Sequence, residues 1–254
     1  MKDREALNIY LAEQFPVEQI KVQLTDWIRH WFSENGPESV AVVGLSGGKD
    51  STVVATLCRE ALGKNRVFGV LMPNHVQADL EEAKAVAQWL QIPYEIVNIG
   101  EATDAMWSIL QPFKQTQQMK NNLPPRIRMT TLYAIAQSKN GRVSNNSNRS
   151  ERYVGYATIF GDAAGDFSPL RNLTVTEVVA LGRSLGIPEE FIAKAPSDGL
   201  TGKTDEDNFG FTYEELDSVI LTGSCEREEA LVRIKALHER NAFKQNPMQG
   251  FELK

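Results

Sequence analysis

The chain has 254 residues, of which 42% are hydrophobic and 24% charged, and its net charge is −6. These values are typical of one soluble globular domain, and an acidic chain without a basic stripe disfavours a nucleic-acid partner. No apolar run approaches the roughly 20 residues that span a bilayer, which excludes a membrane span. Cys58 and Cys225 lie far apart and form no metal-binding pattern, so we expect a cytoplasmic protein.

The first part of the chain alternates between helical and strand patterns. Apolar side chains at helical spacing cover residues 17–33, and the β-branched run VAVVGL at 40–45 predicts a buried parallel strand. Further strands are predicted at 66–72, at 94–99 and near Val143, and helices at 52–62, 79–90, 102–110 and 127–137. This order predicts an α/β fold with a doubly wound parallel sheet flanked by helices, which binds ligands at the carboxyl ends of its strands.

Beyond Gly155 the pattern is less regular. Helices are predicted at 174–185, 213–221 and 226–240, whereas Asp198–Phe209 predicts an exposed loop and a candidate lid. No linker composition marks a boundary near Gly155. We therefore expect residues 1–254 to form a single domain.

The segment Ser46-Gly47-Gly48-Lys49-Asp50-Ser51 lies between a predicted strand and a predicted helix. Its glycines let backbone N–H groups approach an anion, and the hydroxyls of Ser46, Ser51 and Thr52 and the positive helix end add to this cradle. Asp50 would repel a bare phosphate, so its carboxylate predicts a Mg²⁺ ion that bridges the phosphates.

Two alternative structures fit this segment less well. A Walker A loop, G-x-x-x-x-G-K-S/T, has Ser or Thr where this chain has Asp50 and glycine where it has Val43, so the spacing excludes it. A plain strand-to-helix turn, with glycines present only for packing, stays open as the alternative. Such a turn needs neither the hydroxyls nor the carboxylate.

The pattern S-G-G-x-D-S-S/T after an apolar strand resembles the pyrophosphate loop of the N-type ATP pyrophosphatases, which are adenine-nucleotide alpha-hydrolase-like. Four later segments resemble, in the same order, motifs of the ammonia-dependent NAD synthetases: NLPPRIRM at 122–129, SNRSE at 147–151, GYATIFGDAAGD at 155–166, and PSDGL to Asp217 at 196–217. On these residues the chain is identified as a member of that family.

The resemblance implies an ATP-dependent ligase that amidates deamido-NAD (nicotinic acid adenine dinucleotide) with ammonia. The products would be NAD, AMP and pyrophosphate, formed through an NAD-adenylate. It implies Mg²⁺ on Asp50 and Glu151, and its other site assignments form two sets. The ATP contacts would be Gly44, Leu45, Ser46, Gly47, Gly48, Asp50, Ser51, Met72, Arg126 and Asn146, and the deamido-NAD contacts Asn122, Arg126, Arg128, Asp162 and Lys244.

The resemblance also supplies candidate catalytic residues. Asp50 would act through the metal, and a carboxylate near the adenylate would hold ammonium and accept its proton. Asp162 is the first choice and Asp166 the second. A structural role for either, as a loop cap or an arginine partner, stays open.

Several departures from the family pattern concern substrate contacts. Asn145-Asn146 replaces the usual Gly-Thr, and Val175 stands at about the place of a lysine that would contact dinucleotide phosphate, with Arg171 as a possible substitute. Lys203 replaces a glutamine, and Phe243-Lys244 replaces a His-Lys pair. We therefore expect the ATP contacts to follow the family more closely than the dinucleotide contacts.

The family comparison also implies partners. The resemblance implies a homodimer. We also expect the chain to use free ammonia, because the loop at Ser46 leaves no room before it for a glutamine amidohydrolase domain and nothing suitable follows. Two rival functions remain: another ATP pyrophosphatase that adenylates a different carbonyl or carboxylate, and a nucleotide-binding module without catalysis. Asp50 and Glu151 disfavour the second, since binding alone would tolerate their loss.

Overall fold

The structure is a computed structural model that describes residues 2–193, 205–245, 248, 250 and 251. At its centre is a parallel four-stranded sheet in the order β3-β2-β1-β4. The strands are β1 (Val40–Gly44), β2 (Val67–Leu71), β3 (Tyr94–Ile96) and β4 (Gly141–Val143). Val42 pairs with Phe68 on one side and with Val143 on the other. The predicted parallel sheet is confirmed, and its direction of winding reverses between β1 and β4.

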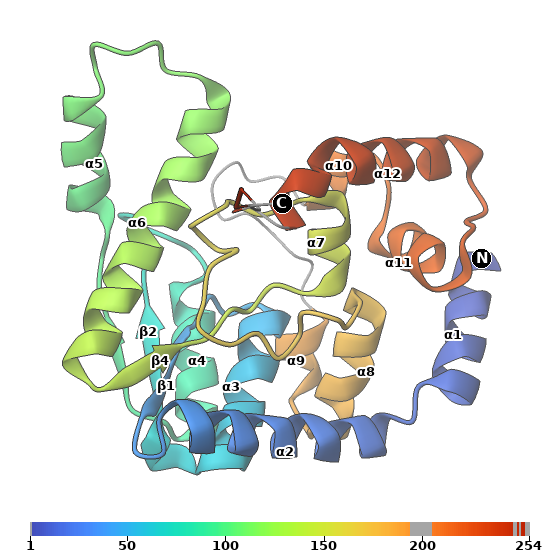
Figure 1. Cartoon of the computed structure of the whole chain (residues 1–254), viewed down its shortest axis with the longest axis horizontal. Helices are drawn as coiled ribbons and strands as arrows, with labels where there is room; N and C mark the ends of the chain where they lie inside the picture. Colours follow the sequence, from blue (N-terminus) through green and yellow to red (C-terminus); the bar gives the residue numbers. More distant parts are fainter. Residues whose placement is uncertain (1, 194–204, 246–247, 249, 252–254) are drawn as a thin grey trace.

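Helices surround this sheet (Figure 1). In the first part of the chain they are α1 (Lys2–Gln14), α2 (Val17–Asn35), α3 (Lys49–Leu62), α4 (Leu80–Leu90), α5 (Gly100–Ile109) and α6 (Gln117–Ser138). In the second part they are α7 (Arg149–Val154), α8 (Val175–Ser184), α9 (Glu189–Ile192), α10 (Asp205–Phe209), α11 (Tyr213–Thr222) and α12 (Glu228–Asn241). Two short 3₁₀ turns are η1 (Lys64–Arg66) and η2 (Ala242–Gln245).

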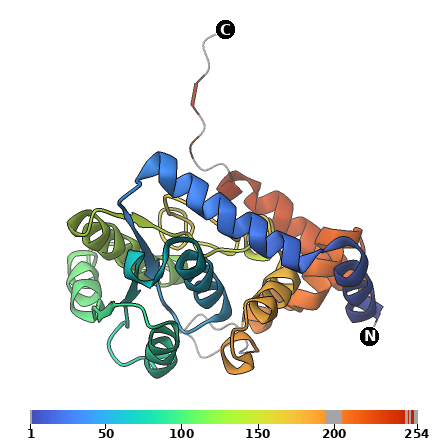
Figure 2. The same ribbon diagram turned by 90° about the horizontal axis from the view of Figure 1, so that it is seen from below.

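Both faces of the sheet are covered, because alternate residues of a strand point to opposite faces. Ala41 and Val43 join an apolar cluster with residues of α2, α3, α4 and α8, whereas Val42 packs on the other face with Leu132 and Ala136 of α6. The helix α2 packs across α3 and α8, as Figure 2 shows. This two-sided packing gives the doubly wound architecture.

A second apolar cluster joins α7, α10, α11 and α12, and includes Val154, Phe209 and Ile234. It lies beside the sheet, at the upper right of Figure 1. The larger cluster contains Val53 before Gly155 and Leu181 after it, so apolar packing continues across that position.

Two segments differ from the prediction. The helix α6 begins at Gln117 and contains Pro124 and Pro125, although the predicted helix began after them at Ile127. Proline lacks the N–H that a helix needs, which is why a sequence pattern disfavours helix there. The side chain of Thr116 nevertheless accepts a hydrogen bond from the backbone of Met119 and caps the earlier start.

The predicted exposed loop at Asp198–Phe209 is wrong for its last five residues, which form α10 with Asp205 and Phe209 buried. Phe209 stacks on Phe211 and meets the ring of Tyr156 edge-on. One aromatic residue in an acidic run creates no periodicity, so only tertiary contact reveals this helix. The rest of the candidate lid, 198–204, lies outside the described residues.

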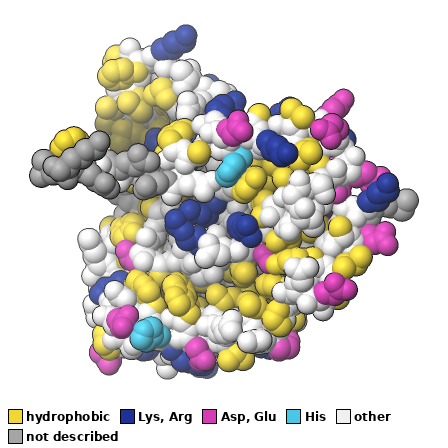
Figure 3. Space-filling view, turned by 45° about the vertical axis from the view of Figure 1, so that its right-hand side comes forward, with side chains coloured by type: hydrophobic (Ala, Val, Ile, Leu, Met, Phe, Trp, Pro, Cys, Tyr) yellow, Lys and Arg dark blue, Asp and Glu magenta, His cyan; other side chains and the backbone are white. Residues whose placement is uncertain are grey.

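Among the described residues, no helix is both long and apolar enough to cross a membrane. On the face shown in Figure 3, Lys and Arg side chains lie in small groups among acidic and apolar ones. They form no continuous basic stripe there, in line with the net charge of −6.

Candidate active site

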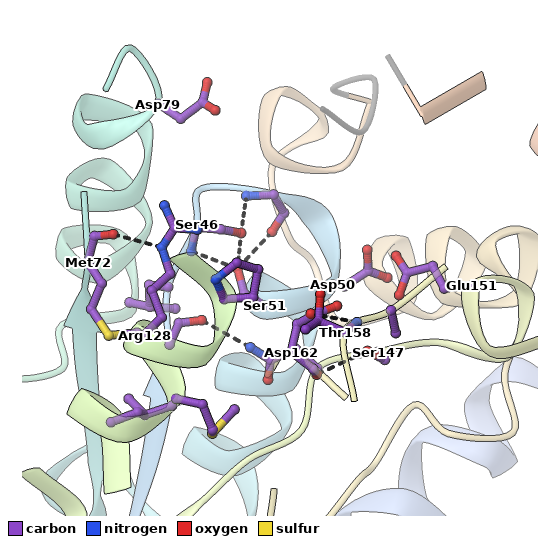
Figure 4. A pocket seen from close by; sticks show the side chains of 18 of the residues that line it. Ser46, Asp50, Ser51, Met72, Asp79, Arg128, Ser147, Glu151, Thr158 and Asp162 are labelled. Carbon is purple, nitrogen blue, oxygen red and sulfur yellow. Dashed lines mark hydrogen bonds between the residues drawn. The ribbon is translucent and has the colours of Figure 1, made fainter. Parts of the chain in front are cut away.

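A cavity of about 510 Å³ opens at the carboxyl ends of β1 and β2. Its walls come from the loop after β1, the residues after β2, the first half of α6, and the segment from Ser144 to Asp162. Figure 4 shows how side chains from these separate segments converge on one space. The sheet thus brings the predicted glycine loop and the later motifs to a single site, where ligands of doubly wound folds bind.

The loop from Ser46 to Ser51 is shaped by its own hydroxyls. The backbone N–H of Gly48 donates to Ser46 Oγ at 3.2 Å, and Ser51 Oγ donates to the carbonyl of Gly48 at 3.1 Å. The helix α3 begins at Lys49 without a side-chain cap. Free N–H groups at a helix start attract an anion, so this loop can hold phosphate.

Glycine is required at position 47 for two separate reasons. Its φ is +79°, and a Cβ there would lie 3.0 Å from the backbone nitrogen of Ala83 and 3.2 Å from the carbonyl of Asp79. Gly47 itself does not line the cavity, although Gly44, Leu45, Ser46, Gly48 and Ser51 do. Its contribution is therefore to let the loop fold against the start of α4. Thr52 is also turned inward, and its hydroxyl donates to Gly48 O at 2.9 Å.

The carboxylates of Asp50 and Glu151 reach the cavity from α3 and α7 (Figure 4). Asp50 accepts hydrogen bonds from Lys49 Nζ at 2.9 Å and from Asn148 Nδ2 at 3.2 Å. Asn148 also caps α7 and forms a capping box with Glu151. Burial first, and the negative charge of Asp50 next, raise the pKa of Glu151 well above its usual range.

This pair of carboxylates suits a hard divalent cation. Each oxygen is a ligand that Mg²⁺ accepts, and the mutual repulsion that raises the Glu151 pKa would be relieved by a cation between them. No group of three or more His, Cys, Asp or Glu side chains within the described ranges is arranged to hold a metal ion. Phosphate oxygens and water would therefore complete the coordination, as is common for Mg²⁺.

A further part of the cavity wall is built around Asp162. Its Oδ1 accepts from the backbone of Thr158 at 2.9 Å, and its carbonyl accepts from the side chains of Asn145 and Ser147. Burial raises the pKa of the Asp162 carboxyl, against the lowering effect of its hydrogen bonds with Thr158 and, to a smaller extent, of the charge of Lys244. Asp162 borders the open cavity, so the carboxyl is surrounded by protein yet accessible to a ligand there.

Lys244 and Asn122 also line the cavity. Lys244 Nζ donates to the carbonyls of Gly155 at 2.7 Å and Ala157 at 3.1 Å. Asn122 Oδ1 accepts from the hydroxyl of Thr158 at 2.9 Å. The predicted substrate residues are therefore held in place by the same 155–162 segment that carries Asp162.

The two arginines of α6 point in different directions. Arg128 lines the cavity and donates to Met72 O at 3.0 Å and Gln77 Oε1 at 3.3 Å, and burial lowers the pKa of its guanidinium. Arg126 is exposed, donates to Ile159 O at 3.2 Å, and is absent from the cavity wall. Residues two apart lie on different faces of a helix, which separates the predicted pair.

Asp166 lies outside the cavity wall. Its carboxylate accepts from Tyr133 Oη at 3.1 Å and from the backbone of Val143 at 2.7 Å, so it ties the loop to α6 and β4. These contacts favour the structural alternative for Asp166. Val175 packs into the cluster of α7 and α11, and Arg171 is exposed; neither lines the cavity. Lys203 lies outside the described residues.

Of the remaining predicted residues, Met72 and Asn146 line the cavity. Asn146 Nδ2 donates to the carbonyl of Gly44 at 3.0 Å and so links the end of β1 to the segment after β4. The Nδ2 of its neighbour Asn145, the residue in place of the usual glycine, donates to Asp162 O at 2.8 Å and to Ala164 O at 3.0 Å.

Sequence patterns did not reveal three features of the site: buried Lys49 beside Asp50, buried Asp205, and Tyr213, whose hydroxyl donates to Asp205 Oδ2 at 3.1 Å. Lys49 occupies the one open position of the loop motif, and a buried lysine has no sequence signature. Asp205 belongs to the family-like segment 196–217, but its burial depends on α10.

The parallel sheet, the phosphate loop after β1 and the two facing carboxylates define a nucleotide-binding α/β protein of the adenine-nucleotide alpha-hydrolase type. The sequence model of the family described as NAD synthase matches residues 20–247. A curated relative from Methanococcus aeolicus, named NH(3)-dependent NAD(+) synthetase, is 43% identical over 84% of this chain and 85% of its own length.

Solved structures give the same result. An NMN synthetase from Francisella tularensis superposes with a TM-score of 0.84 and 35% identity, covering 95% of this chain and 99% of that one. An NH3-dependent NAD synthetase from Campylobacter jejuni superposes with a TM-score of 0.74 and 33% identity, covering 94% and 99%. The chain belongs to the NAD synthase family and is an ATP-using ligase.

Proposed function

We propose that this chain joins ammonia to the pyridine carboxylate of deamido-NAD, at the expense of ATP, and releases NAD, AMP and pyrophosphate. The supporting observation is one cavity lined both by the phosphate loop with Asp50 and Glu151 and by Asp162, Lys244 and Arg128. A pyridine carboxylate bound beside Asp162 would then lie close to the α-phosphate of a nucleotide bound on the phosphate loop.

The proposed ATP site combines two kinds of surface. The loop from Ser46 to Ser51 offers backbone N–H groups for the β- and γ-phosphates. Met72 and Asn146, at the ends of the neighbouring strands, together with Leu71 and Leu132, offer a largely apolar wall for the adenosine. Asp50 and Glu151 would hold Mg²⁺, which supplies positive charge that stabilises the departing pyrophosphate.

The chemistry then needs two displacements. An oxygen of the pyridine carboxylate attacks the α-phosphorus of ATP, the bond to the β-phosphate oxygen breaks, and pyrophosphate leaves. The nitrogen of ammonia attacks the acyl carbon, AMP leaves with the electron pair of the acyl–oxygen bond, and the nitrogen loses a proton. We propose that Asp162 accepts that proton, because it lines the cavity and its raised pKa makes its carboxylate a stronger base.

A second candidate substrate is nicotinic acid mononucleotide, which carries the same carboxylate and lacks the adenylyl half. The structure named NMN synthetase superposes with the higher TM-score of the two above, 0.84 against 0.74. In addition, Val175 replaces the lysine expected on the dinucleotide phosphate and is packed away from the cavity. These observations favour a test of both nucleotides.

The test measures kcat/KM for deamido-NAD and for nicotinic acid mononucleotide, with ammonium and Mg-ATP, by following the amide product and AMP. We expect amidation of deamido-NAD with ammonium, and none with glutamine as the nitrogen source. A higher kcat/KM for the mononucleotide would reassign the substrate. No amide from either nucleotide at saturating ammonium would remove the proposal.

We also propose a homodimer in a reducing cytoplasm. Exposed apolar side chains at Ile109 (67% exposed), Phe113 (64%) and Phe160 (58%) support an interface. Both cysteines are free thiols, which supports a reducing compartment. Light scattering of the purified protein tests the assembly. A monomer at micromolar concentration would contradict it.

A further inference from the structure

Lys49 occupies the position that the loop motif leaves open, and it is placed unusually for a lysine. Its side chain is only 4% exposed, at the first residue of α3. The ammonium lies 2.9 Å from Asp50 Oδ2 and 5.6 Å from the centre of the Tyr213 ring. Lysine is seldom fully buried unless it is paired, so the burial of Lys49 depends on the carboxylates around it.

The surroundings of this ammonium are acidic. Burial alone would lower the pKa of Lys49, but Asp50, Glu151 and Asp205 together outweigh burial and raise it. Asp205 is in turn fixed by the hydroxyl of Tyr213 on α11. Lys49 is therefore the cation that compensates three carboxylates brought together by α3, α7 and α10.

The positive charge of Lys49 stabilises the folded protein and competes with a bound metal ion. Buried carboxylates without a counter-ion are costly, so the ammonium stabilises the fold when no metal is present. The oxygen that accepts its hydrogen bond belongs to Asp50, the same carboxylate proposed to bind Mg²⁺. When a divalent cation binds this oxygen, the ammonium beside it is destabilised, because the two cations repel each other.

We propose that Lys49 is the internal counter-ion of the metal site: its ammonium pairs with Asp50 until Mg²⁺ binds and displaces it. The displaced ammonium still faces Asp205 and the Tyr213 ring. Lys49 thereby weakens the binding of free Mg²⁺ and makes retention of the metal depend on the phosphates that accompany it. The inference rests on the proposed metal role of Asp50 and Glu151.

The test uses Mn²⁺ as an EPR-visible probe for the metal site, without nucleotide and with α,β-methylene ATP, whose α–β linkage cannot be cleaved. Lys49→Met should bind Mn²⁺ about tenfold more tightly without nucleotide, within the range typical of coupled sites. Lys49→Arg, which keeps the charge, should stay within a few-fold of the wild type. Lys84→Met is the matched control, because Lys84 pairs with Glu81 at 2.7 Å outside the cavity.

Thermal unfolding gives a second readout. Lys49→Met without metal should unfold at a lower temperature than the wild type, and Mn²⁺ should restore more of its stability than it adds to the wild type. If Lys49→Met does not fold, Lys49→Gln replaces it in both measurements, and folding only in the presence of Mn²⁺ supports the proposal.

Two results separate the possible failures. In the first, the wild type binds Mn²⁺, and Lys49→Met and Lys49→Gln bind it with the same or weaker affinity. This result overturns the role of Lys49 and leaves the metal role of Asp50 and Glu151 in place. Absence of Mn²⁺ binding in the wild type, with and without α,β-methylene ATP, overturns both.

Discussion

The two carboxylates proposed to bind metal are held by two different kinds of structure. Asp50 lies at the start of α3, where nine residues from Lys49 to Cys58 are buried against the sheet and neighbouring helices. Glu151 lies on α7, a helix of only six residues. The first is placed by backbone shape and apolar packing, and the second by hydrogen bonds between polar side chains.

The hydrogen bonds that hold the helix of Glu151 are centred on Ser150, the residue before it. The Ser150 hydroxyl donates to buried Asp217 of α11 and accepts from the backbone of Val175 at 3.0 Å. Asp217 also accepts from the backbone of Thr176 at 2.7 Å. Because α7, α8 and α11 meet through these polar atoms, the position of Glu151 depends on complete hydrogen bonding. The backbone position of Asp50 depends instead on the close packing of α3, and its carboxylate also accepts from Lys49 and Asn148.

The largest expected effect concerns Asp50, the carboxylate held by the packed helix α3. Asp50→Asn keeps the shape of the side chain and removes its charge, so amidation should fall by about 10³-fold, the scale of a lost electrostatic contact in a transition state. Steady-state formation of NAD and AMP measures the loss, and near-ultraviolet circular dichroism checks the fold. Near-normal turnover would remove Asp50 from the metal role.

A pH experiment tests the polar region. Burial raises the pKa of Asp217 from 3.8 to about 6, against the lowering effect of its bonds to Ser150 and Thr176. A carboxyl with a raised folded pKa contributes stability below its unfolded pKa and loses it as pH rises through the folded value. The change amounts to about 3 kcal/mol between pH 3.8 and 6.

Asp217→Asn should remove this part of the pH dependence of the free energy of unfolding. Urea denaturation of both proteins at a series of pH values from 4 to about 7 measures the difference between the two curves. Parallel curves would show that Asp217 does not titrate in this range.

Removal of one hydroxyl gives a smaller effect on the same region. Ser150→Ala leaves Asp217 and the Val175 N–H without that partner and should cost about 2 kcal/mol of unfolding free energy. It should also raise the Mg²⁺ concentration needed for half-maximal activity, because Glu151 is adjacent. Ser138→Ala is the control, since the hydroxyl of exposed Ser138 donates to Ile135 O within its own helix. Equal losses in the two variants would contradict the role of Ser150.

The smallest effect tests the packed region through a pair of glycines. Gly47 and Gly63 have φ values of +79° and +80°, but a Cβ would meet backbone atoms only at Gly47. Gly63→Ala should cost about 1 kcal/mol from its backbone conformation alone. Gly47→Ala should cost more and should also raise KM for ATP, because the loop must move from α4. An unchanged KM would show that the loop tolerates that movement.

Most of the sheet could be predicted because its evidence is local. Val40 to Gly44 is a continuous apolar run, and the glycine loop follows directly, so strand, turn and phosphate binding can all be predicted from one stretch of sequence. By contrast, α10 and the helical start of α6 depend on contacts with distant residues. The arginine pair shows the same limit, since the motif names Arg126 and Arg128 but only the helix decides that Arg128 faces the cavity.

The amino-acid sequence alone determined the fold class, the phosphate loop and the family, because these depend on short motifs and on their order along the chain. The tertiary structure alone decided that Asp162 lines the cavity while Asp166 supports β4, and that Lys49 lies buried beside Asp50. The physical reason is that burial and charge compensation depend on atoms far apart in the chain. Glu151 and Asp205 meet Lys49 only after α3, α7 and α10 have packed together.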